Sequence, residues 1–220
     1  MTDLKQKIIE FKHNQNFGIE NFFISSCNKH VLDLLNLWPN WERKFLNIIG
    51  DNYSGKTHLM NIFLKKFKGI KFEATFLNND NLESIKRYQN IVLENLNNNI
   101  DEKLIYTLIN IIDQDDKYLV VTSKEPIAEL KFGLVDLKSR AKNFLMQKIE
   151  RPDDELMFAL ILKNLSDRQI SLDKKLINYI IKKIDRSYRN IFEFIYKVDQ
   201  MSLKKKKSIN LKIIKEVLGE

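Results

Sequence analysis

The most informative segment of the sequence is Gly50-Asp51-Asn52-Tyr53-Ser54-Gly55-Lys56-Thr57. It fits the pattern G-x-x-x-x-G-K-[ST], in which glycines let the backbone turn tightly so that successive N–H groups face phosphate oxygens. In this pattern we expect Lys56 to reach the β- and γ-phosphates of a nucleotide and the Thr57 hydroxyl to hold Mg²⁺. A helix that starts here also directs the positive end of its dipole at the anion. The segment therefore predicts a phosphate-binding loop.

The residues on either side have the patterns that such a loop requires. Residues 45–49 form a short apolar run typical of a buried strand, and residues 58–64 place apolar side chains at helical spacing. The alternative is a glycine-rich turn without a ligand, which needs neither flank. We therefore take the loop, including Asn52, Tyr53 and Ser54 and the adjoining His58, as the candidate cofactor-binding segment.

The composition is that of an ordinary soluble globular protein, with 44% hydrophobic and 30% charged residues among 220. The single cysteine, Cys27, cannot form a disulfide within the chain, which favours a reducing compartment. The N-terminus lacks a signal-peptide pattern, and no apolar run reaches membrane-spanning length. We therefore expect a cytoplasmic protein without a membrane partner.

The net charge of +8 favours nucleic acid, acidic proteins or polyphosphate ligands as partners. The basic residues are scattered, however, and the densest run, Lys204-Lys205-Lys206-Lys207, lies between two helical patterns. We interpret this run as a solvated loop, with a nucleic-acid contact as the alternative. Direct DNA binding is therefore expected to be weak or absent.

Strand and helix patterns alternate through the first two thirds of the sequence. We predict strands over residues 45–49, 71–77, 90–94, 118–123 and 144–149, and further helices over residues 28–37, 101–112 and 134–140. This alternation predicts an α/β fold in which a mostly parallel sheet has helices on both faces. After Pro152 only helices are predicted, over residues 153–165, 173–184, 188–201 and 210–218. We expect a flexible arm over residues 1–20, a nucleotide-binding base over residues 21–151 and a small all-helical lid over residues 152–220.

Further polar residues follow in the order expected around a bound nucleotide. Glu94 ends a predicted strand and can ligate Mg²⁺ through water, whereas the amide of Asn95 cannot accept a proton from an attacking water. Ser123 ends the next strand, where a hydroxyl can orient a phosphate or a water. Arg140 closes a short helix, and Arg189 opens a lid helix. The alternative for each is an ordinary strand-end or surface side chain, but their order argues for a common site.

These segments resemble the AAA+ family, in particular its branch of bacterial replication initiators (DnaA) and shorter Hda-type regulators. The resemblance runs over nearly the whole sequence. Residues 50–59 resemble Walker A, residues 91–95 Walker B, Thr122-Ser123 sensor I, Leu137-Lys138-Ser139-Arg140 the arginine-finger motif, and Arg189 sensor II. Residues 16–25 are similar to the segment that lines the adenine pocket, which implies a nucleotide contact for Phe22. Trp38-Pro39-Asn40-Trp41 resembles the stretch before the first strand of Hda-type proteins.

The resemblance implies a P-loop AAA+ sheet followed by a helical lid, with ADP or ATP and Mg²⁺ as ligands. Arg140 would act in trans on ATP bound to a DnaA subunit, and Glu94 and Ser123 would be the other candidate catalytic residues. The sequence given ends directly after the lid pattern, and we therefore expect an Hda-type regulator instead of an initiator with its DNA-reading domain. Asn95 implies that any ATPase activity of the chain itself is weak.

Hda-type proteins also carry an N-terminal motif that docks on the DNA sliding clamp, the β subunit of DNA polymerase III. The run Gln6-Lys7-Ile8-Ile9-Glu10-Phe11 has the required spacing, with Gln6, Ile9 and Phe11 as the expected contacts. The alternative is the start of an amphipathic helix, since Leu4, Ile8 and Phe11 also fall at helical spacing.

The function implied by the resemblance is that of a clamp-tethered regulator, which promotes hydrolysis of DnaA-bound ATP and so represses re-initiation of replication. Its partners would be the sliding clamp and DnaA, and self-association is left open. Two alternatives remain. One is an autonomous AAA+ ATPase such as a helicase loader, and the other is a nucleic-acid-binding accessory protein that uses the run of four lysines.

Overall fold

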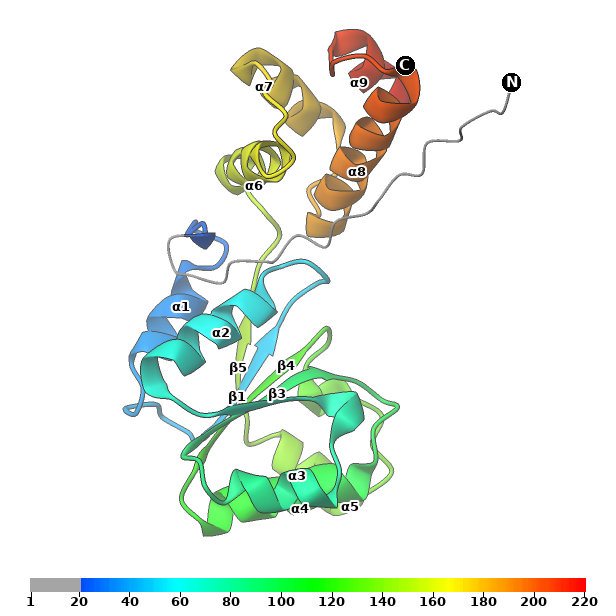
Figure 1. The fold of residues 1–220 in the computed structure, drawn as a ribbon. Coiled ribbons are helices and arrows are strands. Elements are labelled where there is room, and N and C mark those ends of the chain that lie inside the picture. Colours follow the sequence, from blue (N-terminus) through cyan, green and yellow to red (C-terminus); the bar gives the residue numbers. More distant parts are fainter. Residues whose placement is uncertain (1–20) are drawn as a thin grey trace, which may run out of the picture.

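The computed structural model describes residues 21–220, and its centre is a five-stranded sheet with the strand order β2-β3-β4-β1-β5 (Figure 1). The strands are β1 (Phe45–Ile49), β2 (Ile70–Glu73), β3 (Asn90–Leu96), β4 (Tyr118–Ser123) and β5 (Leu145–Lys148). Every neighbouring pair is parallel. The carboxyl ends of all the strands therefore meet at one edge of the sheet, which is where such folds bind ligands.

Helices cover both faces of this sheet (Figure 1). One face carries α1 (Lys29–Asn36) and α2 (Lys56–Phe67), and the other carries α3 (Asn79–Ile85), α4 (Glu102–Gln114) and α5 (Val135–Ala141). Two short 3-10 helices, η2 (Ala74–Phe76) and η3 (Ile127–Glu129), follow β2 and β4. The predicted class, an α/β fold with a parallel sheet between two layers of helices, is confirmed.

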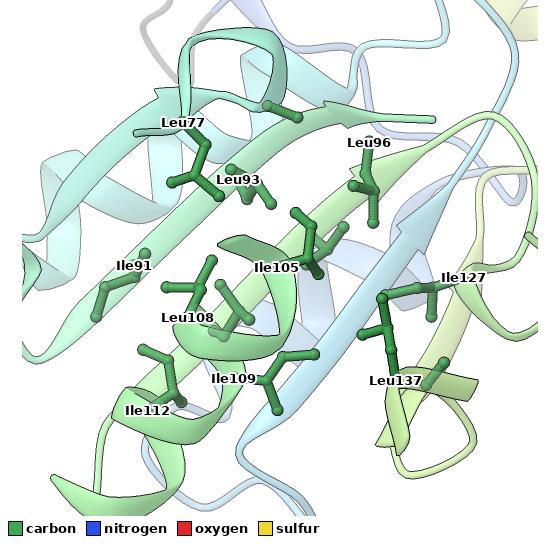
Figure 2. Close-up of a cluster of buried hydrophobic side chains, with 14 of the residues drawn as sticks. Leu77, Ile91, Leu93, Leu96, Ile105, Leu108, Ile109, Ile112, Ile127 and Leu137 are labelled. Atoms are coloured by element: carbon green, nitrogen blue, oxygen red, sulfur yellow. The ribbon is translucent and has the colours of Figure 1, made fainter. Parts of the chain in front are cut away.

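Two apolar clusters hold the sheet between its helices. On one face, Leu108 and Ile112 of α4 belong to the same buried cluster as Ile91 and Leu93 of β3 (Figure 2). Buried α4 residues recur every three or four positions, so a single stripe of the helix faces the sheet. On the other face, the buried side of α2 packs with β1 and α1. This second cluster fixes the helix that follows the phosphate-binding loop.

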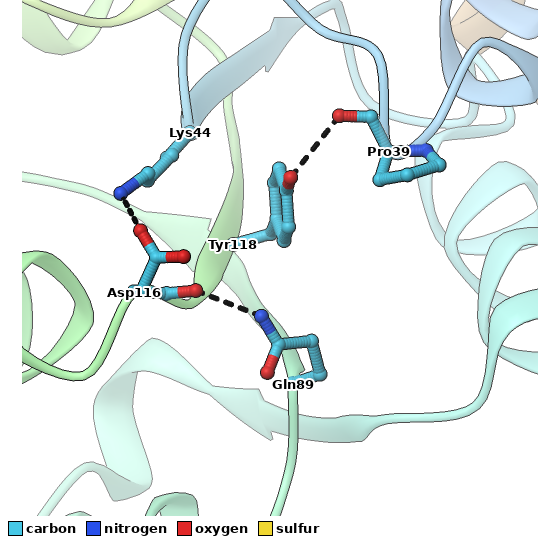
Figure 3. Close-up of polar contacts among 5 residues, drawn as sticks. All are labelled: Pro39, Lys44, Gln89, Asp116 and Tyr118. Carbon is cyan, nitrogen blue, oxygen red and sulfur yellow. Dashed lines mark hydrogen bonds and ion pairs between the residues drawn. The ribbon is translucent and has the colours of Figure 1, made fainter.

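Polar contacts close the edge at which the strands begin (Figure 3). The Lys44 ammonium, just before β1, pairs with the carboxylate of Asp116, just before β4. The Gln89 amide donates to the Asp116 carbonyl at 2.8 Å, and the Tyr118 hydroxyl donates to the Pro39 carbonyl at 3.1 Å. These contacts tie β1, β3 and β4 together at the edge opposite the phosphate-binding loop.

After β5 the chain forms a helical unit with its own apolar cluster. The helices are α6 (Asp154–Ser166), α7 (Lys174–Lys183), α8 (Tyr188–Lys205) and α9 (Leu211–Leu218). Each begins with a side-chain cap, from Asp153, Asp173, Ser187 and Asn210 respectively. Each capping side chain accepts a hydrogen bond from a backbone N–H group of the first turn that would otherwise lack a partner. The sequence itself therefore determines where the four helices begin. The helical C-terminal region is confirmed, while the boundary at residues 151–152 stays a prediction.

The structure differs from the sequence analysis in three places. The strand predicted over residues 71–77 ends at Glu73, where the chain turns into the 3-10 helix η2 at Ala74. The sequence does not predict α3, a short helix with only Leu82 and Ile85 buried. The four-lysine run is not wholly a loop. Its first two residues lie in the last turn of α8, where cations suit the negative end of the helix dipole.

The predicted arm over residues 1–20, with Gln6, Ile9 and Phe11, lies outside the described residues. Among the helices that the structure describes, none is both long and apolar enough to cross a membrane.

Candidate functional site

The phosphate-binding loop connects the carboxyl end of β1 to the first turn of α2. Gly55 caps α2 in the left-handed region, with φ of 92°, a conformation that favours glycine. The Gly50 N–H donates to the Ser123 carbonyl at 3.1 Å and so joins the start of the loop to the end of β4. The residues predicted as Walker A and sensor I therefore meet at one edge of the sheet.

Lys56 lies inside the loop. Its ammonium donates to the carbonyls of Gly50 at 2.7 Å and Asp51 at 2.9 Å, and the side chain is buried. Burial lowers the pKa of Lys56, and the carboxylates of Asp51 and Glu94 partly oppose this shift. The loop thus holds a desolvated cation on two backbone carbonyls, which a phosphate can replace as its partner.

The loop also brings Ser54 against Gly50. A Cβ atom added at Gly50 would lie 2.6 Å from the Ser54 Oγ atom, so a larger residue there would force the Ser54 side chain to move. This Oγ atom is buried and has no hydrogen-bond partner within the described residues. A buried hydroxyl without a partner is uncommon in proteins, and a ligand phosphate would supply an acceptor for it.

Phe22 covers the start of α2. A Cβ atom added at Gly55 would lie 3.1 Å from the Phe22 ring, and this ring meets the His58 ring edge-on, with centroids 5.2 Å apart. The predicted adenine-pocket residue and the predicted loop are therefore in contact. Their role in binding a base stays a prediction.

The lid reaches the loop through an aromatic pair. The rings of Tyr53 in the loop and Phe192 in α8 have centroids 4.9 Å apart. Arg189, one turn earlier in α8, is exposed and pairs with Glu193 at 2.6 Å, which raises the pKa of the guanidinium. The structure thus places the helix of Arg189 against the loop, but the arginine itself contacts Glu193.

Glu94 is buried on β3 and is held by a lysine of the neighbouring strand. The Lys71 ammonium of β2 lies 3.0 Å from the Glu94 Oε2 atom and donates to the Asn61 Oδ1 atom of α2 at 2.9 Å. The other carboxylate oxygen, Oε1, is buried without a hydrogen-bond partner in the described part of the chain. The carboxylate therefore has one compensated and one uncompensated oxygen.

Asn95 has a left-handed backbone, with φ of 59°. Its N–H donates to the Thr122 Oγ1 atom at 3.0 Å, and its side-chain amide donates to the Glu73 carboxylate at 3.0 Å. The side chain that replaces the expected acid therefore contacts a carboxylate at the end of β2.

Ser123 is fully buried and belongs to a network centred on Asn47 of β1. The Ser123 hydroxyl donates to the Glu125 carbonyl at 2.6 Å and accepts from the Asn47 amide at 2.9 Å. The Asn47 Oδ1 atom accepts from the buried Ile127 N–H at 2.8 Å. This network fixes the end of β4 beside the loop, whereas contact between the Ser123 hydroxyl and a phosphate stays a prediction.

Arg140 does not join the loop. It lies in the last turn of α5, on the sheet face opposite α2, and its Nη1 atom contacts the Asp113 carboxylate of α4 at 2.8 Å (Figure 1). α5 leads into β5, whose first residue lies at the edge where the strands begin, away from the end of β1. The guanidinium is only partly exposed, since 35% of its side chain remains accessible.

The donors at the loop fit a magnesium nucleotide. The Thr57 hydroxyl and the unpartnered Glu94 Oε1 atom are oxygen donors of the kind that Mg²⁺ accepts together with phosphate oxygens. Within residues 21–220, the His, Cys, Asp and Glu side chains form no group of three that could hold a metal ion.

Four residues of the site were not predicted from the sequence, namely Lys71, Glu73, Asn47 and Phe192. These residues come from β1, β2 and α8, and only the strand order and the placement of the lid bring them to the site. One signal was available for the two β2 residues. Lys71 and Glu73 are two residues apart in a predicted strand, a spacing that places two side chains on the same face of a sheet.

Comparisons with known proteins agree with this geometry. A family profile described as "Hda, lid domain" matches residues 153–218. The chromosomal replication initiator protein DnaA of Borrelia duttonii is 27% identical, with 92% of this chain aligned to 48% of the initiator. An uncharacterized protein of Haemophilus influenzae is 25% identical over 91% of this chain and 93% of its own length. The chain thus spans about half the length of the DnaA relatives that it matches.

Solved structures resemble the whole arrangement of base and lid. Domain III of the Thermotoga maritima initiator DnaA superimposes with a TM-score of 0.71 at 20% identity, over 94% of this chain and 97% of that chain. The AMPPCP-bound DnaA of Aquifex aeolicus gives a TM-score of 0.67 at 18% identity, over 86% of this chain and 66% of that chain. The phosphate-binding loop, the parallel sheet, the lid match and these relatives together support an AAA+ protein related to Hda and DnaA.

Proposed function

We propose that this chain is a nucleotide-binding regulator of the replication initiator DnaA, that the sliding clamp tethers it, and that Arg140 promotes hydrolysis of ATP bound to DnaA. The observation that carries the proposal is the match of residues 153–218 to the lid of Hda. Under this proposal the chain works in the cytoplasm and represses re-initiation of replication.

The chain's own site would bind ADP or ATP. Lys56 and Thr57 would hold the phosphates and a magnesium ion, and Phe22 would lie against the base. AMPPCP binding by the Aquifex aeolicus relative supports this assignment. Arg189 would leave Glu193 and reach the phosphates, since its helix already contacts the loop through Phe192 and Tyr53.

Arg140 would enter the active site of a neighbouring DnaA subunit. Its position on the face away from the chain's own loop supports a role in trans. A trans arginine contributes about 10³–10⁵ in rate by compensating charge in the transition state, which corresponds to roughly 4–7 kcal/mol. The ion pair with Asp113 holds the guanidinium when no partner is bound.

The test is DnaA-bound ATP hydrolysis in the presence of clamp loaded on DNA. Arg140→Ala should bind ADP like the wild type but lose the stimulation by about 10³-fold or more. Arg43→Ala is the matched control, because Arg43 is exposed near the same edge and its guanidinium donates to the Lys142 carbonyl at 3.5 Å, without a carboxylate partner among residues 21–220. Stimulation by Arg140→Ala at the wild-type rate would refute the trans role.

The clamp contact is tested separately, because it rests on Gln6, Ile9 and Phe11, which lie outside the described residues. Replacing Gln6 and Phe11 with alanine should remove retention on immobilised clamp while ADP binding is unchanged. Retention equal to that of the wild type would refute the motif without touching the assignment of Arg140.

A second candidate function is an autonomous ATPase. The observation that favours it is the Glu73 carboxylate, which lies 3.0 Å from the Asn95 amide and could replace the acid missing from position 95. Steady-state turnover of ATP by the isolated chain separates the two functions. Sustained turnover that is lost in Glu73→Gln would favour the ATPase, and a negligible rate would favour the regulator.

A further inference from the structure

Lys71 is the one strand residue whose ammonium reaches the candidate magnesium ligand in the described part of the chain. It lies on β2 and bridges the Glu94 Oε2 atom of β3, at 3.0 Å, and the Asn61 Oδ1 atom of α2, at 2.9 Å. Asn61 lies one helical turn after Thr57, and residues at this spacing are neighbours on a helix surface. The Lys71 cation is therefore placed beside the position where Thr57 and Glu94 would share a metal ion.

Positively charged side chains offset the buried Glu94 carboxylate without a metal ion. Glu94 is 6% exposed at its side chain and is attracted both to Lys71, which is 30% exposed, and to the buried Lys56. Two ammonium groups thus face one buried carboxylate. Asp51 and Glu73 also lie nearby but are more exposed, so water and salt screen their charges more strongly.

The distribution of charge would differ in a nucleotide site whose strand acid had no cation beside it. The carboxylate and the phosphates repel each other in a poorly solvated site, and a divalent cation between them removes the repulsion. Here the Lys71 ammonium, 3.0 Å from the Glu94 Oε2 atom, already compensates part of the charge of the carboxylate.

We infer that Lys71 takes over part of the electrostatic role of the divalent cation, so that this chain binds a nucleoside diphosphate with little dependence on Mg²⁺. The inference rests on the nucleotide site of the proposed function and adds to it the metal requirement. Lys71 is a positioning residue, because it acts on the nucleotide through Glu94. The unpartnered Glu94 Oε1 atom remains available to a metal-bound water, so Mg²⁺ is tolerated but not required.

The experiment is calorimetric titration of the full chain with ADP, once with EDTA and once with millimolar Mg²⁺. For the wild type the two dissociation constants should agree within roughly threefold. Lys71→Met should bind about tenfold or more weakly in EDTA and should recover in Mg²⁺, because the metal ion replaces the missing charge. Lys71→Arg, which retains the charge, should resemble the wild type.

Two further variants separate charge from folding. Lys65→Met is the matched control, because it removes the same charge from an exposed position of α2 and should leave the ratio of the two constants unchanged. The double variant Lys71→Met with Glu94→Gln replaces the ion pair by neutral side chains. It should regain affinity in EDTA relative to Lys71→Met, since no uncompensated carboxylate remains.

The outcomes distinguish this inference from the proposed function. The inference alone is overturned if the wild type binds ADP about tenfold or more tightly in Mg²⁺ than in EDTA. It is also overturned if the ratio of these two dissociation constants is the same in Lys71→Met as in the wild type. Absence of ADP binding under both conditions overturns the nucleotide site and the inference together.

Discussion

Asn47 offers a sharp test of how the end of β4 is held beside the phosphate-binding loop. Its side chain is fully buried on β1. The Oδ1 atom accepts from the Ile127 N–H at 2.8 Å, and the Nδ2 group donates to the Ser123 Oγ atom at 2.9 Å and to the Val121 carbonyl at 3.2 Å. Asn47→Ala removes all three contacts at once and leaves the strands otherwise unchanged.

The expected cost follows from these contacts. The Ser123 hydroxyl keeps its bond to the Glu125 carbonyl, so the main loss is the buried Ile127 N–H, which is left without an acceptor. An orphaned buried donor costs about 1–3 kcal/mol, and each lost bond contributes about 0.5–1.5 kcal/mol. Asn47→Ala should therefore lower the free energy of unfolding by roughly 2–4 kcal/mol, a large share of the stability of a typical domain.

The assay is urea unfolding followed by tryptophan fluorescence, since the chain's two tryptophans, Trp38 and Trp41, both belong to or pack against the base cluster around α2. Asn98→Ala is the matched control. The Asn98 Oδ1 atom also accepts a backbone N–H at 2.8 Å, from Lys131, but at an exposed position where water can replace it. Equal losses in the two variants would show that burial does not set the cost and would refute the reasoning.

Two further predictions concern the loop itself. Gly55→Ala places a Cβ atom at φ of 92° and 3.1 Å from the Phe22 ring, so it should cost about 1–2 kcal/mol in thermal or urea unfolding, whereas Gly133→Ala, with only ordinary contacts, should be nearly neutral. Burial lowers the pKa of Lys56 below 10.5, so the folded state loses the ammonium proton at a lower pH than the unfolded state does. The unfolding free energy of the wild type relative to Lys56→Met should therefore rise with pH from the lowered pKa up to 10.5, and a constant difference across that window would contradict it.

Local patterns in the sequence were enough to predict most elements of the fold. The loop glycines, the apolar run before them and the helical spacing after them act within a few residues of one another, so the strand β1, the turn and the helix α2 could be read directly. The same holds for the helices α6 to α9, whose capping residues stand next to their first turns. Where the local signal was weak, as in α3 with two buried residues, the prediction was absent.

The partners within the site were not predictable in this way, because they depend on which strands become neighbours. The order β2-β3-β4-β1-β5 places β2 beside β3, and the pairing of Glu73 with Glu94 then brings Lys71 within reach of the Glu94 carboxylate. In the same way, the packing of α5 beside α4 gives Arg140 its contact with Asp113. Both contacts join residues that are far apart in the sequence, so no local sequence pattern predicts them.

The sequence by itself therefore determined the phosphate-binding loop, the alternation of strands and helices, and the list of candidate polar residues. Only the tertiary structure decided that Glu94 is compensated by Lys71, that Asn95 faces Glu73, and that Tyr53 meets Phe192 of the lid. The physical reason is that backbone preferences and hydrophobic period act over a few residues. Charge balance in a site depends on contacts between segments that only the packing of the sheet and lid brings together.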